Sequence, residues 1–538
     1  MVFRDGRKIP NKDELITDVC IIGGGPTGLS IAREFINQKF SVTVLESGDE
    51  KFTHHAQVLN IARSIGRLYF DPVFTRHRLL GGSSTTWFGL CRPLDRIDFE
   101  KRDWIPYSGW PFGLEEIEPY YQRAAEVLHL PREDFLLENY LHDGQQRIET
   151  DLIETSVFQF SPPTNFREAY AETIALSKNC QILLNSNVQE ILTSEDGKRV
   201  EKVVVKSGRK KTFTMIAKVF ILAGGGIENP RLLLNSTQPY KAGLGNQNDL
   251  VGRYFNEHPH MFNATITHQS LDFFQGIYSP MDYKNPTSPM PPTSSLILKE
   301  EVKREQKMLN ACAILVERPI YKMKKEYSST GGLGFMRLAE IFSHDRSLFG
   351  SLTADLGRVI KNPGDLAKIL SEQSKAIFTE QKVVSLRIMM ETEPNPESRI
   401  TLSDRRDRLG NRRVNVNWQL TNRDHEDFNR FKTALLNELE GLAFVIDEIN
   451  HELDEAGWPV SMVAAKHHSG TTRMHKNPTR GVVDENSKVH GVGNLYIAGC
   501  SVFPTSGFSN PTYTLVALAI RLADHIKDVM DKGDFPKS

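Results

Sequence analysis

The feature that most constrains the fold of this chain is a run of glycines near its start, between two apolar segments. Residues 19–22 are short and wholly apolar, which predicts a buried strand. The run that follows reads Gly23-Gly24-Gly25-Pro26-Thr27-Gly28, and a helix is expected to begin at its end. A second apolar strand, residues 42–45, then leads to Glu46. This order of strand, glycine turn, helix, strand and acid is typical of a dinucleotide-binding fold.

Each part of this pattern has a physical role in holding a dinucleotide. Gly23 can make the tight turn, Gly25 lets the backbone approach a pyrophosphate, and Gly28 lets helix and strand pack closely. The start of the helix favours the negative pyrophosphate, and Glu46 can accept hydrogen bonds from the ribose hydroxyls. A tight turn in some other α/β protein is the alternative, and the complete pattern argues against it.

Further glycine turns occur along the chain. Residues 78–87 contain the loop Gly81-Gly82-Ser83-Ser84, whose backbone amides suit a phosphate or the polar edge of a flavin ring. Residues 218–230 and 494–499 are again apolar strands that enter glycine turns. One half of a dinucleotide does not need three such turns. The sequence therefore favours a cofactor held along its whole length, as FAD is.

Composition excludes several classes of function. The 538 residues predict at least two domains, or one domain with a large insertion. The 66 basic and 67 acidic residues balance to a net charge of −1, which gives no support to nucleic-acid binding or to a polybasic membrane contact. No stretch predicts a transmembrane segment, and the first residues lack the apolar core of a signal peptide. A cytoplasmic location is the simplest expectation.

The cysteines and histidines do not predict a metal site. The five cysteines are scattered and odd in number, so they form neither a CxxC pair nor a disulfide framework. The closest approaches to a ligand cluster are His54-His55 and His258-Pro259-His260, and neither has a third ligand at a recognised spacing. We therefore expect no metal.

The C-terminal third carries the most specific motifs. They are His467-His468-Ser469-Gly470-Thr471-Thr472-Arg473-Met474, then residues 481–484, 490–496 and Asn510-Pro511-Thr512. With the glycine run and the loop at 81–84, these motifs resemble the glucose-methanol-choline (GMC) family of FAD-dependent oxidoreductases. The segment 391–399 leads into a predicted strand and resembles the branch that contains pyranose and glycoside oxidases. Residues 261–380 match little that is recognisable.

The resemblance implies an α/β fold with two domains. A discontinuous Rossmann-type FAD-binding domain would comprise residues 1–260 and 456–538. An inserted α+β substrate-binding domain, residues 261–455, would be built on an antiparallel sheet. The β-prone stretches 383–390 and 400–402 are expected to belong to this sheet, over the flavin. Residues 278–295 are expected to form a long loop, and residues 348–370 a broken helix.

The resemblance also assigns the site residues. His467 takes the position of the catalytic base, with His468 the weaker candidate, and Asn510 takes the position that hydrogen-bonds the same substrate oxygen. Asn510 is also in the position of a cap for the helix that follows, and both roles can hold. The residues expected to bind FAD are Gly23, Gly25, Pro26, Thr27, Gly28, Glu46, Arg78, Gly81, Gly82, Ser83, Ser84, Val188, Ala223, Gly499, Cys500, Asn510, Pro511 and Thr512.

One departure from the sugar-oxidising branch concerns how FAD is attached. Pyranose oxidases bind it covalently through the histidine of a Thr-His-Trp triplet, whereas this chain has Thr85-Thr86-Trp87. Thr86 cannot form that bond, so noncovalent FAD is expected. The predicted activity is oxidation of a hydroxyl group of a sugar, glycoside or polyol, with O2 or another electron acceptor. A dehydrogenase of another alcohol, such as a lipid alcohol, and a non-redox lyase that retains FAD are the alternatives, and a homo-oligomer is left open.

Overall fold

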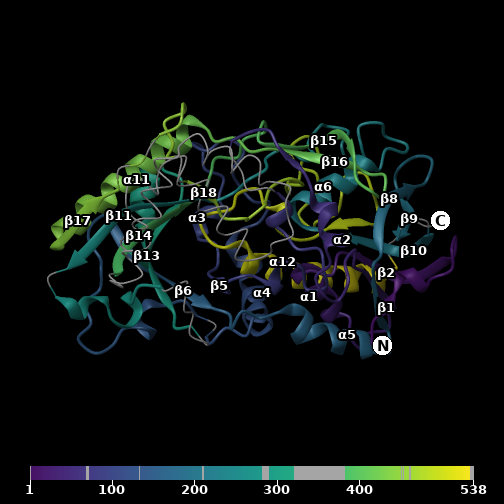
Figure 1. Cartoon of the computed structure of the whole chain (residues 1–538), viewed down its shortest axis with the longest axis horizontal. Coiled ribbons are helices and arrows are strands. Elements are labelled where there is room, and N and C mark those ends of the chain that lie inside the picture. Colours follow the sequence, from purple (N-terminus) through teal and green to yellow (C-terminus); the bar gives the residue numbers. More distant parts are fainter. Residues whose placement is uncertain are drawn as a thin grey trace.

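The computed structural model contains two large sheets that lie at opposite ends of the molecule (Figure 1). It describes residues 2–67, 72–132, 134–208, 211–268, 270–281, 290–319, 382–449, 451, 453–459 and 462–533. The expected helix at 348–370 lies outside these residues, as do residues 282–289 of the expected loop at 278–295. The end of that loop was predicted wrongly, because residues 293–295 belong to the strand Thr293–Leu298. No helix in the described part of the chain is both long enough and apolar enough to cross a membrane.

The first sheet is the predicted nucleotide-binding sheet. Its strands run in the order β1-β7-β3-β2-β10-β9-β8, and β19 also pairs with β10. The pairs β1–β7, β7–β3, β3–β2, β2–β10 and β10–β19 are parallel. The pairs β10–β9 and β9–β8 are antiparallel. The bounds are β1 (Arg4–Asp5), β2 (Glu14–Ile22), β3 (Val42–Leu45), β7 (Cys180–Leu184), β8 (Asn187–Thr193), β9 (Val200–Ser207), β10 (Lys211–Leu222) and β19 (Leu495–Ile497).

The parallel strands are apolar because helices pack against the sheet. All four residues of β3 are buried, as are the last four of β2. The helix α1 (Pro26–Glu34) follows β2 and packs on the C-terminal helix α12 (Pro511–Lys532), which in turn packs on α4 (Leu114–Val127). Proline at the first position starts α12, and Gly533, at φ +68°, ends it in the left-handed region. The α/β class predicted from the sequence is therefore confirmed.

The second sheet is antiparallel and has the order β17-β11-β14-β13-β12-β6-β5, with β18 beside β11. We call it the roof sheet. The helix α11 (Asn422–Gly441) packs against it. Its strands are β5 (Leu90–Cys91), β6 (Ile153–Phe160), β11 (Pro259–His268), β12 (Thr293–Leu298), β13 (Ala311–Pro319), β14 (Lys382–Met390), β17 (Phe444–Glu448) and β18 (Val463–Ala464).

One predicted strand belongs elsewhere. Residues 383–390 lie in β14 of the roof sheet, as expected, but residues 400–402 lie in a separate three-stranded sheet. That sheet consists of β15 (Arg399–Arg406), β16 (Arg412–Asn417) and β4 (Arg63–Ser64). The expectation for 400–402 was wrong because β15 pairs locally with β16 and packs against α6 (Gly225–Asn235) of the nucleotide-binding part.

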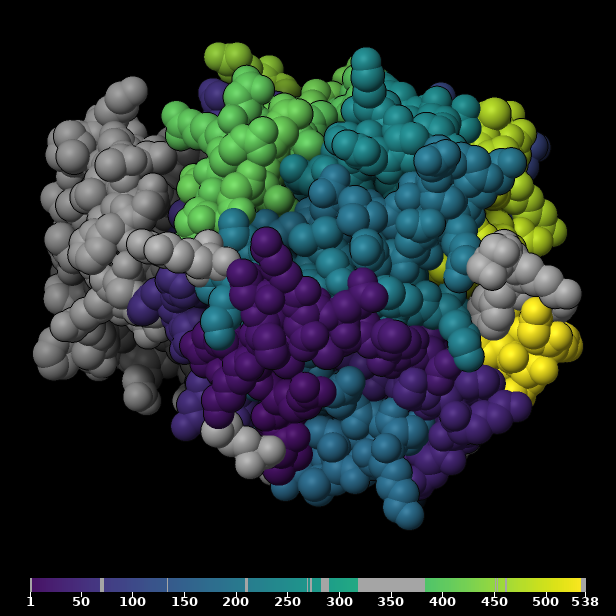
Figure 2. All heavy atoms as spheres, turned by 90° about the vertical axis from the view of Figure 1, so that its right-hand side faces the viewer, coloured from purple at the N-terminus to yellow at the C-terminus, as the bar shows by residue number. Residues whose placement is uncertain are grey.

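Segments far apart in the sequence share one surface. Strand β16 pairs in parallel with β4, and on the face drawn in Figure 2 the purple N-terminal residues lie below green residues near position 400. Strands β5 and β6 precede the expected insertion, yet they extend the roof sheet. Four short α-helices complete the described α-helices: α2 (His54–Gln57), α3 (Arg96–Phe99), α5 (Glu172–Leu176) and α7 (Glu300–Glu305).

Candidate active site

The glycine run forms the tight turn between β2 and α1. Gly23 has φ +117°, and a β-carbon there would lie 2.6 Å from the carbonyl oxygen of Ala223. A β-carbon on Gly28 would lie 1.9 Å from the carbonyl oxygen of Gly23. Both positions therefore exclude side chains, and strand and helix approach as closely as the sequence pattern predicts.

Glu46 lies at the end of β3 beside this turn. Its Oε2 accepts a hydrogen bond from the Gly24 amide at 2.8 Å, and its Oε1 accepts one from the Gly48 amide at 2.7 Å. The residue is only 5% exposed. The carboxylate is thus fixed at the edge of the glycine turn, and its contact with a ribose stays a prediction from the sequence pattern.

The second glycine loop lies directly against the first. The Gly81 amide donates to the Gly24 carbonyl at 2.8 Å, and a β-carbon on Gly25 would lie 4.0 Å from the Gly82 α-carbon. Ser83 is exposed, whereas the buried Ser84 hydroxyl donates to the Gly81 carbonyl and accepts from the amide of Phe166. Gly25 is therefore where the backbone is open to a ligand, between two loops that were predicted to share one site.

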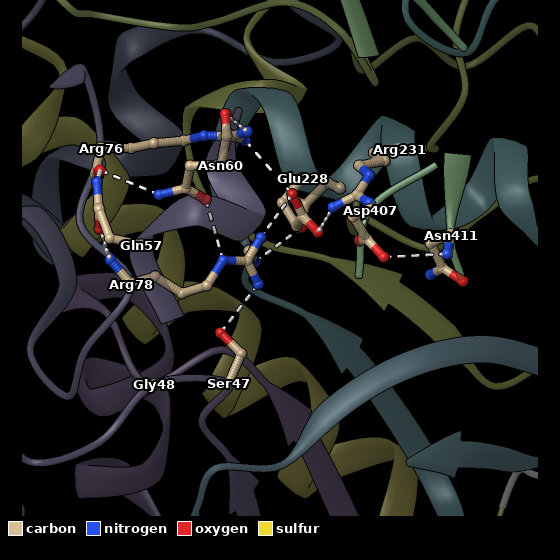
Figure 3. Close-up of polar contacts among 12 residues, drawn as sticks. Ser47, Gly48, Gln57, Asn60, Arg76, Arg78, Glu228, Arg231, Asp407 and Asn411 are labelled. Carbon is tan, nitrogen blue, oxygen red and sulfur yellow. Dashed lines mark hydrogen bonds and ion pairs between the residues drawn. The ribbon is translucent and has the colours of Figure 1, made fainter. Parts of the chain in front are cut away.

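Arg78 is part of a charged network next to Glu46 (Figure 3). Its guanidinium donates to Ser47 Oγ and to Asn60 Oδ1, each at 3.0 Å, and pairs with Glu228 Oε2 at 3.0 Å. Burial would raise the pKa of Glu228, but Arg231, Arg78 and Arg76 together lower it below its usual range. Arg78 thus acts on this region through fixed protein partners, and direct contact with FAD stays a prediction.

The network reaches from the second glycine loop to the three-stranded sheet. Arg231 of α6 pairs with Glu228 at 2.9 Å and with the buried Asp407, which follows β15, at 2.5 Å. Figure 3 shows these groups in one continuous set of contacts. We infer that it holds α6 and its glycine turn in place.

The remaining predicted FAD residues lie around the same sheet edge or beside it. Pro26 and Thr27 open α1, Pro511 and Thr512 open α12, and Ala223 follows β10, where its amide donates to the Ile22 carbonyl. Gly499 follows β19, and a β-carbon there would lie 3.3 Å from Thr27 Oγ1. Cys500 donates from Sγ to the His468 carbonyl at 3.0 Å. Val188 lies in β8, paired with Val205 on the antiparallel side of the sheet.

His467 lies in a segment that the roof sheet and the nucleotide-binding part both contact. Its ring is partly buried, and its Nδ1 lies 3.0 Å from Nδ1 of His258. Burial, followed by the neighbouring His258, His468 and Arg387, holds the pKa of His467 well below 6.5. The ring is therefore neutral at physiological pH, the state in which it can accept a proton.

Asn510 precedes α12 but does not cap it with its side chain. It occupies the N-cap position, as predicted, yet no hydrogen bond joins its side chain to the first turn. Its Oδ1 is buried and has no hydrogen-bond partner among the described residues. A buried oxygen without a partner is costly, so this atom indicates a donor that the described residues do not supply.

Backbone hydrogen bonds connect the segments that carry the two predicted catalytic residues. The amides of Gly470 and Thr472 donate to the carbonyls of Cys500 and Ser501, at 3.2 and 2.8 Å. Closer to Asn510, Ser506 Oγ donates to Asn256 Oδ1 at 3.4 Å, and Asn256 pairs with Ser469. The segments 467–474 and 500–510 are thus held as one unit.

The sequence analysis missed the role of residues 256–260. His258-Pro259-His260 was considered only as a metal-ligand cluster, whereas both rings lie near His467, with centroid distances of 5.1 and 6.1 Å. Burial lowers the pKa of His258 to about 4. The spacing of two histidines with one residue between them, at the start of a strand, was the available indication, because such residues face the same side. No group of three potential ligands in the described ranges is arranged to hold a metal ion.

The residues present fit FAD at this site. The open backbone at Gly25, the amides at the start of α1 and the carboxylate of Glu46 suit a pyrophosphate and a ribose. The start of α12 would favour negative charge on a reduced flavin ring, and the unpartnered Asn510 Oδ1 lies at that helix start.

Comparisons with protein-family models agree with both parts of the fold. Residues 18–241 match the FAD dependent oxidoreductase model, and residues 394–519 match the GMC oxidoreductase model.

Individual relatives resemble the chain at low identity. The 2-methyl-1,2-propanediol dehydrogenase of Mycolicibacterium austroafricanum is 22% identical over 97% of this chain and 98% of its own. The C-glycoside 3-oxidase of Microbacterium trichothecenolyticum is 30% identical over 27% of each chain. Among solved structures, pyridoxine 4-oxidase from Mesorbium loti covers 95% of this chain and 99% of its own, at 16% identity and a TM-score of 0.53. This structural likeness supports the fold alone.

Proposed function

We propose that this chain, whose residues 18–241 and 394–519 match the FAD dependent oxidoreductase and GMC oxidoreductase models, oxidises a hydroxyl group of a sugar, glycoside or polyol to a carbonyl. In this proposal His467 is the general base, and Asn510 hydrogen-bonds the same substrate oxygen. Bound FAD would supply the acceptor, at flavin N5, for the hydride that leaves the substrate carbon.

The observation that carries the proposal is the pair of unused polar atoms on these two side chains. Asn510 Oδ1 is buried without a partner. His467 Nδ1 is engaged with His258, and no hydrogen bond within the described residues uses His467 Nε2. A substrate hydroxyl offers a donor, and its oxygen can also accept from the Asn510 amide. Its single proton can go to His467 Nε2 while its oxygen accepts from the Asn510 amide nitrogen, so one alcohol group can contact both side chains, and Asn510 Oδ1 stays open to a second donor of the substrate.

The proton and electron balance follows from these positions. His467 takes the hydroxyl proton at Nε2, and the carbon–hydrogen bond breaks with its electron pair, which leaves a carbonyl. A base with a low pKa loses no fraction to protonation at neutral pH, and a general base contributes roughly 10² to 10⁴ to the rate. The buried surroundings of His467 suit the uncharged form with which the reaction begins.

The names of the relatives favour a polyhydroxylated substrate. They include a propanediol dehydrogenase, a C-glycoside 3-oxidase and a paromamine 6'-oxidase. The first two of these names specify a diol and a glycoside. We extend that class to this chain, and the particular hydroxyl group is for experiment to identify.

The proposal is tested by anaerobic absorbance of the FAD-loaded protein. Sugars, glycosides, polyols and simple aliphatic or aromatic alcohols are added in turn, and loss of the oxidised flavin band is recorded before and after air is admitted. We expect bleaching by members of the first three classes. Rapid recovery in air indicates an oxidase, and slow recovery indicates a dehydrogenase with another acceptor.

Other outcomes distinguish the alternatives. Bleaching only by simple alcohols would replace the sugar class with another alcohol. If no alcohol reduces the bound flavin, the redox role of His467 is contradicted, and lyase chemistry becomes the account to test.

A further inference from the structure

Backbone hydrogen bonds join residues 256–260 to the segment that contains His467. Asn256 and Ser469 exchange two backbone hydrogen bonds, of 3.0 and 3.1 Å, and the amide of Ala465 donates to the His258 carbonyl at 3.0 Å. Pairing of β11 with β18 continues this ladder, with His260 opposite Val463. The register of the two segments is fixed by backbone contacts, so His258 meets His467 in a defined geometry.

Glu257 fixes the backbone of His467. Its Oε2 accepts from the His467 amide at 2.9 Å, and its Oε1 lies 3.5 Å from Nε2 of His468. The Glu257 side chain is fully buried. A buried carboxylate oxygen that accepts the His467 amide holds this part of the backbone, so the His467 ring starts from a fixed backbone position.

The ring of His258 lies in direct contact with the ring of His467. The two Nδ1 atoms lie 3.0 Å apart, and the rings are nearly perpendicular, at 84°. His258 is 1% exposed, so water does not compete for this contact. Two neutral imidazoles share one proton in such a bond, and one Nδ1 must donate while the other accepts.

We propose that His258 is a positioning residue that accepts a hydrogen bond from Nδ1–H of His467 and so leaves Nε2 of His467 free to take the substrate proton. The opposite arrangement would put a proton on His467 Nε2, and that tautomer cannot act as a base. The hydrogen bond itself is inferred from the geometry of the two rings. Its effect on the reaction rests on the proposed function.

The surroundings of His258 favour the accepting form. Its Nε2 is buried and has no hydrogen-bond partner among the described residues. The Gly507 backbone raises the pKa of this ring, against the larger effect of burial. A proton on Nε2 of His258 leaves its Nδ1 as the acceptor that the proposal requires. Burial keeps His258 uncharged. His260 approaches His467 edge-on at 6.1 Å without a hydrogen bond between the rings, so it cannot take over this task.

The tautomer can be read without any substrate. Holoenzyme labelled with ¹⁵N-histidine gives nitrogen shifts that separate protonated from unprotonated ring nitrogens, and His467→Asn assigns the resonance. We expect His467 to carry its proton on Nδ1, and His258→Leu to shift the equilibrium toward Nε2–H. A proton on Nε2 of His467 in the unaltered protein would overturn the proposal.

Kinetics tests the consequence. With a substrate that bleaches the flavin, His258→Leu should slow flavin reduction by about three- to tenfold, the worth of one neutral hydrogen bond, with substrate affinity unchanged. His258→Asn places an amide oxygen near the lost Nδ1 and should restore most of the rate. His451→Asn is the matched control, because His451 donates from Nε2 to the Phe262 carbonyl and no hydrogen bond joins it to His467. It should leave the rate unchanged.

The outcomes separate the two proposals. Equal losses in His258→Leu and His258→Asn would mean a purely structural role and would overturn the inference. If no alcohol reduces the flavin of the unaltered protein, the proposed function fails, while the nitrogen shifts still decide whether His258 sets the tautomer.

Discussion

A buried ion pair between Arg102 and Glu391 offers a test of how the roof sheet is joined to the rest of the molecule. Nη2 and Nη1 of Arg102 donate to Glu391 Oε1 and Oε2 at 2.5 and 2.8 Å. The side chains are 1% and 0% exposed. Glu391 directly follows β14, and its neighbour Thr392 donates to Asn256 Oδ1 at 2.7 Å. The ion pair therefore stabilises residues 256–260, which are hydrogen-bonded to the segment that contains His467.

Arg102→Met removes one partner and leaves the other buried. Only the Asn310 amide, at 3.1 Å, would still donate to the Glu391 carboxylate among the described residues. Breaking such a pair costs about 3–5 kcal/mol of unfolding free energy. An unfolding entropy of about 2.1 cal/mol/K per residue makes 1 kcal/mol worth roughly 1 °C in a chain of 538 residues. We expect the melting temperature of the holoenzyme, followed by flavin fluorescence, to fall by about 3–5 °C.

Two controls make the reasoning refutable. Adding Glu391→Leu to Arg102→Met removes the buried charge and should recover most of the loss. Arg304 pairs with Glu100 at 2.7 Å, but these side chains are 39% and 36% exposed, so Arg304→Met should cost less than about 1 °C. A melting temperature for Arg102→Met within 1 °C of the unaltered protein, or a double variant no better than the single one, would refute the argument.

Three further predictions concern the site itself. At Gly28 even a β-carbon would lie 1.9 Å from the Gly23 carbonyl oxygen, so purified Gly28→Val protein should lack the yellow flavin. The control Gly441→Ala adds a β-carbon that meets nothing within 4 Å, so this variant should keep the flavin. A yellow Gly28→Val protein would contradict this. Because Thr86 replaces the linking histidine, acid precipitation should leave a colourless pellet and a yellow supernatant, and a yellow pellet would indicate a covalent bond. Because burial, His258, His468 and Arg387 lower the pKa of His467, flavin reduction should fall only below that pKa and lose little between pH 8 and pH 6, whereas a base with an ordinary histidine pKa would fall to about a quarter at pH 6.

The parts of the fold that depend on neighbours in sequence were predictable. The strand at 42–45 and the glycine turn at 23–28 were predicted at the positions where they occur, because burial and turn geometry are written in adjacent residues. The start of α12 at Pro511 follows the same logic. The local sequence was therefore sufficient to predict the nucleotide-binding part and the order of its motifs.

Contacts between distant segments were not predictable. Residues 400–402 have the composition of a roof strand, and only the pairing of β16 with β4, far away in the sequence, places this pair of strands in another sheet. The bond between His258 and His467 joins residues 209 positions apart. Asn510 was predicted as a helix cap because it occupies the N-cap position, but its side chain makes no capping hydrogen bond. In each case tertiary contacts decided the outcome.

The main expectation is that His467 removes the substrate proton while the hydride goes to bound FAD. Its most direct test is single-turnover reduction of the flavin by an alcohol substrate, measured anaerobically in the unaltered protein and in His467→Ala. We expect His467→Ala to keep FAD and to reduce it roughly 10² to 10⁴ times more slowly. A variant that retains FAD and is reduced at the unaltered rate would contradict the claim.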